Sequence, residues 1–222
     1  MVESLESLAS YWAKSPNPLR WNCIFVLPPW LKTWWREFGS EGNLYLYAAR
    51  QRGIVVGIAP LFLKGDEAFF IGSEDLCDCL DFIVAPGRER DFFHILLDDL
   101  NKKGISSLRL RALRPNSTVL TYLVGMARER GYHVSCAVED VSLELDLPPT
   151  WEEYLGMLNK KQRHEVRRKL RRIREAGQVN YRTVEDSGDI PEAMEIFLEL
   201  FRQSRRDKGA FMNTQRESFF RS

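Results

Sequence analysis

Positive charge is concentrated in residues 160–182, which contain ten lysines and arginines but only two glutamates. This stretch carries a local charge of +8 in a chain whose net charge is +1, so the remaining residues sum to −7. Lys160, Lys161 and Arg163 fall in the first turn of an expected helix, where each exposed cation opposes the helix macrodipole by about 0.3–1 kcal/mol. Free N–H groups at the same place favour anions. The pattern predicts an anionic ligand there; the alternative is a solvated helix whose arginines cover nearby apolar surface.

The ends of this helix are marked in the sequence. Asn159 is a favourable N-cap, and Gln162, three residues later, indicates a capping box. Gly177 follows where a glycine often ends a helix in the left-handed region. Three apolar residues recur at helical spacing and predict a narrow stripe that faces a core: Val166, Leu170 and Ile173.

Other residues suited to chemistry are few. Asp78 and Asp81 lie at the end of a polar loop between two short apolar runs. The four cysteines form no CxxC pair and the three histidines are scattered, so no metal site is expected, and the thiols are expected to be reduced and mostly buried. Phosphate-binding glycine loops, dinucleotide fingerprints and the common hydrolase motifs are absent from the sequence. The motifs therefore name no catalytic residue.

Alternating helices and strands must position these residues, and they predict an α/β or α+β fold. Helices are expected at 5–12, 28–38, 88–103, 117–130, 150–158, 160–176 and 190–206. Strands are expected at 43–50, 54–63, 68–71, 80–84, 107–112, 132–138, 141–147 and 179–184. Pro60 implies that strand 54–63 is an edge strand or contains a bulge.

The order of these elements suggests a first domain at 1–149, closed by two prolines, and a helical connector at 150–177. A further domain begins at 178–222 with a strand and a helix but no sheet to complete them, so the chain is expected to be truncated inside it. An apolar fraction of 44% is typical of a folded globular protein. No apolar run approaches the ~18–20 residues that span a bilayer, and the acidic N-terminus does not resemble a signal peptide. A cytoplasmic protein is therefore expected.

Several motifs in this order resemble one family of the GNAT acyltransferase superfamily. The family comprises the cellulose-biosynthesis-associated (CelD/BcsL-type) acetyltransferases, which are relatives of the Fem peptidyltransferases. The downstream motifs are LDLP at 145–148, WEEYL at 151–155, NKKQR at 159–163, VRR at 166–168, Gly177 and Val179. The upstream motifs are PWL at 29–31, WW at 34–35, FG at 38–39, GIAPL at 57–61, Asp78, LDF at 80–82 and APG at 85–87. The resemblance covers residues 28–209, and its specificity lies in the order and spacing of the motifs.

The resemblance implies two GNAT-like units in tandem, the second of which carries the acyl-donor groove. It implies transfer of an acyl group from acetyl-CoA or another acyl-CoA to an amine on a sugar, lipid or peptide precursor. The donor-binding loop and the strands that polarise the thioester are expected beyond Ser222, which leaves open whether this chain is itself catalytic. Under this hypothesis an anionic acceptor, such as a polysaccharide or cell-envelope precursor, is held by Lys160, Lys161, Arg163 and Arg167. Asp78 and Asp81 would face the same cleft and receive its amine or hydroxyl groups.

Two alternatives from other functional classes remain. The basic helix would neutralise several phosphates in a nucleic-acid-binding protein, although the rest of the chain is acidic and no known nucleic-acid module matches. The chain would otherwise be a non-catalytic GNAT-like scaffold that docks partners or an anionic membrane, although the apolar stripe of the helix is narrow and has no aromatic residue.

Overall fold

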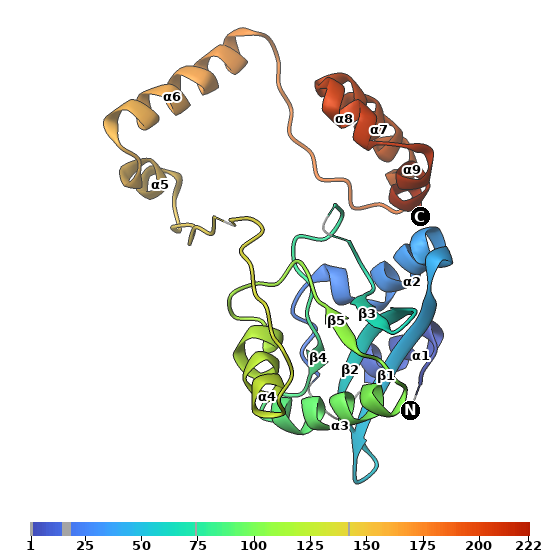
Figure 1. Ribbon diagram of the computed structural model, residues 1–222. Helices are drawn as coiled ribbons and strands as arrows, with labels where there is room; N and C mark the ends of the chain where they lie inside the picture. Colours follow the sequence, from blue (N-terminus) through green and yellow to red (C-terminus); the bar gives the residue numbers. More distant parts are fainter. Residues whose placement is uncertain (1, 15–18, 74, 142) are drawn as a thin grey trace. The chain divides into compact units, whose positions relative to one another are not determined.

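The computed structural model describes residues 2–14, 19–73, 75–141 and 143–222 (Figure 1). The chain divides into two compact units: the first comprises Met1–Ala137 with Leu200–Ser222, and the second comprises Val138–Glu199. The domains at 1–149, 150–177 and 178–222 stay a prediction.

A mixed five-stranded sheet forms the centre of the first unit. β1 (Asn43–Gln51) and β2 (Ile54–Lys64) form an antiparallel hairpin. β3 (Glu67–Phe70) and β4 (Ile83–Val84) both pair antiparallel with β2, and β5 (Ser107–Arg109) pairs parallel with β3. The predicted α/β fold with a mixed sheet is therefore confirmed and is consistent with a GNAT-like architecture. β4 and β5 are shorter than the strands predicted at 80–84 and 107–112.

One face of the sheet is covered by α3 (Glu89–Lys102) and by a helix that starts as a π-helical turn, η3 (Val119–Leu123), and continues as α4 (Val124–Glu129). Figure 1 shows α3 crossing this face of the strands. A group of aromatic rings fills the core between these layers: Phe70, Phe82, Phe92 and Phe93. α3 packs closely on the sheet at Gly57, where a Cβ would lie 2.4 Å from Cδ2 of Phe92.

The other face is covered by α1 (Leu5–Lys14), α2 (Pro28–Phe38) and α9 (Thr214–Arg221). α9 lies far along the chain from α2 but packs on it, with the ring of Phe219 5.0 Å from that of Trp30. Because helices bury both faces, β1 alternates its side chains between two cores. This double burial explains why β2 is a nearly continuous apolar run rather than an alternating one.

Pro60 predicted either an edge strand or a bulge. The first alternative is wrong, because β2 pairs with neighbours on both sides. The strand does contain a shift in its register with β1, but it lies between Val55 and Gly57 rather than at Pro60.

In β2, Gly57 and Ile58 pair with β4, and the residues from Leu61 onward pair with β3. Pro60 lies between these two sets. The carbonyl of Pro60 accepts a hydrogen bond from the N–H of Ile71 at 2.9 Å, on the side of β2 where the pairing passes from β4 to β3. A residue without an N–H is tolerated there because the ladder is interrupted at that point.

The regular elements among the described residues of the second unit, 138–141 and 143–199, are helices. The unit contains α5 (Trp151–Met157), α6 (Lys160–Glu175) and the start of α7 (Ile190–Ser204). The short α8 (Arg206–Phe211) follows before α9. The predicted helices in this region are confirmed, with α7 ending two residues earlier than predicted.

The predictions of strands at 132–138, 141–147 and 179–184 are wrong. No described residue of these segments lies in a strand. Their apolar side chains are in contact with solvent: Leu143 is 93% exposed and Tyr181 is 94% exposed. An alternating apolar segment becomes a strand only beside a partner strand that completes its hydrogen bonds and covers its side chains. None of these segments has such a partner within the described chain.

Candidate functional site

The start of the basic helix α6 has the predicted geometry. The side chain of Asn159 accepts a hydrogen bond from the N–H of Gln162 at 2.9 Å, and the side chain of Gln162 accepts one from the N–H of Asn159 at 3.2 Å. A hollow of about 590 Å³ lies over this first turn and is lined by Lys160, Lys161, Arg163, His164 and Arg167. The four cations predicted to bind an acceptor therefore border one hollow.

These four cations differ in what already surrounds them. The guanidinium of Arg163 donates to three backbone carbonyls at the end of α5: Leu155 at 2.7 Å, Leu158 at 2.9 Å and Gly156 at 3.3 Å. Arg167 lies 3.8 Å from the carboxylate of Glu152. Lys160 and Lys161 are exposed, and their ammonium groups have no hydrogen-bond or ion-pair partner among the described residues. The two lysines are thus the cations that an anionic ligand would find unoccupied.

The contacts of Arg163 predict a structural effect for its replacement. Arg163→Ala would remove the guanidinium donor from the carbonyls of Leu155, Gly156 and Leu158, of which Leu155 still accepts the N–H of Leu158 at 3.3 Å. We expect amide hydrogen exchange at Tyr154 and Leu158 to become about tenfold faster, corresponding to a local loss of about 1.4 kcal/mol. Lys161→Ala, two residues away and without such contacts, should leave these rates unchanged. Equal rates in the wild type and in Arg163→Ala would show that the guanidinium does not hold α5.

The prediction that the apolar stripe of α6 faces a core is wrong for this structure. Leu170 is 36% exposed and Ile173 is 48% exposed, and no residue of α6 is buried. The stripe has no core to face because none of the described residues before α5 or after α6 in this unit lies in a strand that could cover it.

Asp78 and Asp81 belong to the first unit, whereas the cations belong to the second. Asp78 is exposed. The carboxylate of Asp81 accepts hydrogen bonds from the N–H of Phe82 at 2.9 Å, and from the N–H and hydroxyl of Thr118 at 2.8 and 2.6 Å. Burial raises the pKa of Asp81 above its usual range, and these donors partly oppose the shift. Asp81 therefore anchors the helix that begins after Thr118, and its place in a common site with the cations stays a prediction.

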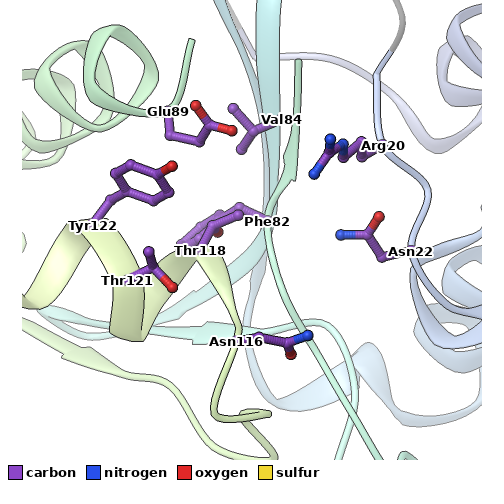
Figure 2. A pocket seen from close by; sticks show the side chains of 9 residues that line it. All are labelled: Arg20, Asn22, Phe82, Val84, Glu89, Asn116, Thr118, Thr121 and Tyr122. Carbon is purple, nitrogen blue, oxygen red and sulfur yellow. The ribbon is translucent and has the colours of Figure 1, made fainter. Parts of the chain in front are cut away.

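A second hollow, of about 310 Å³, lies in the first unit (Figure 2). Its lining is mostly polar: Arg20, Asn22, Phe82, Val84, Glu89, Asn116, Thr118, Thr121 and Tyr122. Four separate segments contribute these residues, from before η1 (Ile24–Val26), from β4, from the start of α3 and from the start of η3. The sequence analysis missed this pocket because no local spacing connects the four segments.

Two of the four cysteines have the buried thiol that the sequence predicted. Cys77 and Cys79 are buried, Cys23 is half-buried and Cys136 is exposed. Burial raises the pKa of Cys77 and raises that of Cys79 to about 12, so neither is a thiolate at neutral pH. In the part of the chain that the structure describes, no group of acidic, cysteine or histidine side chains is arranged to hold a metal ion. None of the described helices has the length and apolar character that a membrane span requires.

The second unit offers only part of what an acyl-CoA needs. The first turn of α6 combines backbone N–H groups with cations and so fits a phosphate. The described residues of this unit form no strand whose backbone could contact a thioester carbonyl. These residues fit an anionic group but not a whole acyl-CoA.

Comparison with known families gives one match. Residues 160–222 match the family model described as an acetyltransferase (GNAT) domain. The matched region begins at the first residue of α6. No curated protein and no solved structure matches the chain. GNAT domains generally catalyse acyl transfer from acyl-CoA. The match therefore supports membership of the GNAT superfamily for residues 160–222.

Proposed function

We propose that the protein is a GNAT-type N-acyltransferase of the cellulose-biosynthesis-associated (CelD/BcsL-type) family. It transfers an acyl group, such as acetyl, from acyl-CoA to an amine on a sugar, lipid or peptide precursor. The observation that carries this proposal is the match of residues 160–222 to a GNAT acetyltransferase domain. All four cysteines are unpaired, which fits a protein that works in the reducing cytoplasm.

In this proposal the start of α6 recognises an anionic acceptor. Its hollow is bordered by cations and contains the unpaired ammonium groups of Lys160 and Lys161. A phosphate or carboxylate on the acceptor would find both charge and N–H donors there. Arg163 would act indirectly, by holding the end of α5 beside the hollow. The exposed Asp78 is the predicted acid that stays available to an amine or hydroxyl group.

Acetyl-CoA binding, measured by isothermal titration calorimetry, tests the proposed activity. The measurement uses the 222-residue chain and a chain continued past Ser222. Binding by either chain, followed by acetylation of an amine acceptor, would support the proposal. Binding by neither would overturn it and favour a scaffold or a nucleic-acid-binding protein, which titration with a short DNA duplex at low salt would then distinguish.

Acceptor recognition by the lysines has its own test with glucosamine 6-phosphate, a probe that carries both an amine and a phosphate. We expect the double variant Lys160→Ala/Lys161→Ala to bind it about tenfold more weakly, because two charge-assisted contacts are lost. Lys102→Ala, an exposed lysine at the end of α3, is the matched control and should bind as the wild type does. Glucosamine, which lacks the phosphate, should be insensitive to the double variant. Equal affinity of the wild type and the double variant for the phosphate probe would refute the role of the lysines.

A further inference from the structure

The polar pocket of the first unit has two charged walls. Figure 2 shows Arg20 and Asn22 projecting into it from one side, and Glu89 and Tyr122 from the other. Between them the buried Phe82 and Val84 form an apolar floor. Thus one cation and one anion border the same small cavity.

Neither of these charged groups is neutralised by the protein. Among the described residues, the guanidinium of Arg20 and the carboxylate of Glu89 have no hydrogen-bond or ion-pair partner, and no ion pair joins them to each other. Other charges next to the pocket are satisfied: Arg88, adjacent to Glu89, donates to Asp91 at 2.9 Å and also to Gln51. Two unpaired charges of opposite sign around one cavity are complementary to a ligand that carries both signs.

The walls of the pocket are held in place by the fold. The N–H of Arg20 donates to the carbonyl of Val84 at 3.1 Å, and the neighbouring Leu19 is buried. Thr118 is fixed by its two hydrogen bonds to Asp81. Glu89 is the first residue of α3, whose inner face belongs to the core. The backbone around the pocket is therefore already in place, which lowers the ordering cost of binding.

We propose that this pocket binds a small zwitterion, a molecule that carries both an ammonium and a carboxylate group. The carboxylate pairs with the guanidinium of Arg20 and the ammonium with the carboxylate of Glu89. The carboxamides of Asn22 and Asn116 and the hydroxyl groups of the wall donate or accept hydrogen bonds in between. A cavity of about 310 Å³ suits a free amino acid or a dipeptide. Binding here requires no acyl transfer and no contribution from α6.

Two-dimensional ¹H–¹⁵N NMR of the 222-residue chain tests this assignment. The zwitterionic probes are glycine, β-alanine, γ-aminobutyrate and alanyl-alanine, which differ in the separation of their charges. Propionate and propylamine are the matched probes with a single charge. We expect at least one zwitterion to shift the amide signals of the pocket residues at concentrations below about 10 mM, and to bind at least tenfold more tightly than either singly charged probe. A response to the amino acids but not to the dipeptide would identify a free amino acid as the ligand class.

Two variants remove one charge each without changing side-chain shape greatly: Arg20→Gln and Glu89→Gln. Each should weaken zwitterion binding about tenfold or more. Arg20→Gln should also reduce the preference for the zwitterion over propylamine, and Glu89→Gln the preference over propionate, because each variant removes the contact that the singly charged probe lacks. The controls Arg90→Gln and Glu129→Gln remove exposed charges outside the pocket and should change nothing. A thermal melt of each variant confirms that it is folded. No shift with any zwitterion, or equal binding of propionate and the zwitterions, would overturn the proposal.

Discussion

Replacing Phe92 by alanine is expected to lower the free energy of unfolding of the first unit by about 3–5 kcal/mol. The side chain of Phe92 is fully buried, and its ring lies 5.0 Å from that of Phe93 and 5.4 Å from that of Phe82. Truncation removes buried apolar area and leaves a cavity between α3 and β2, in a core whose other rings are already in contact. Urea unfolding followed by tryptophan fluorescence measures the loss. Tyr132→Ala, at a partly exposed aromatic residue, should change stability by no more than about 0.5 kcal/mol.

A double-mutant cycle with Gly57 shows whether close packing causes the effect. Alone, Gly57→Ala places a Cβ 2.4 Å from Cδ2 of Phe92 and should cost about 1–3 kcal/mol. In the Phe92→Ala background the new methyl group enters vacated space, so its cost should fall by at least about 1 kcal/mol. The same cost in both backgrounds would show that the glycine is required for another reason.

Replacing Asp81 by alanine is expected to lower the free energy of unfolding by about 3 kcal/mol, because donors of Phe82 and Thr118 lose their buried acceptor. The loss should appear in the same urea experiment. Asp78→Ala removes an exposed carboxylate three residues away and should change stability by no more than about 0.5 kcal/mol. Similar effects of the two substitutions would contradict the anchoring role of Asp81.

The burial of Asp81 also gives this prediction a dependence on pH. Its pKa is raised in the folded chain, so between the unfolded and folded pKa values the folded chain binds more protons. Its contribution to stability is therefore largest below the unfolded pKa and declines as the pH rises through the folded pKa. The difference in stability between wild type and Asp81→Ala should shrink over that range and then level off, because the three donors still bind the ionised form. A difference that grows with pH would mean that hydrogen bonding outweighs burial.

Sequence reasoning succeeded where local interactions decide the structure. Pro28 in the first turn of α2, the capping pair Asn159 and Gln162, and the turn between β1 and β2 all act over four or five residues. Their elements appear at or within one residue of the predicted bounds. The strand predicted at 141–147 failed because a strand depends on a distant partner. Its alternating pattern predicts which side chains would share a face, but it does not predict whether a partner strand is present.

The candidate site divides in the same way. The gathering of positive charge on one capped helix follows from the sequence, because charge, caps and helical spacing are all local properties of residues 159–177. Three features instead depend on tertiary packing: the carbonyls of α5 occupy Arg163, Asp81 anchors Thr118, and a charged pocket forms around β4. These contacts join residues from 8 to 37 positions apart, or segments still more distant, and they follow from how the chain packs rather than from any local pattern.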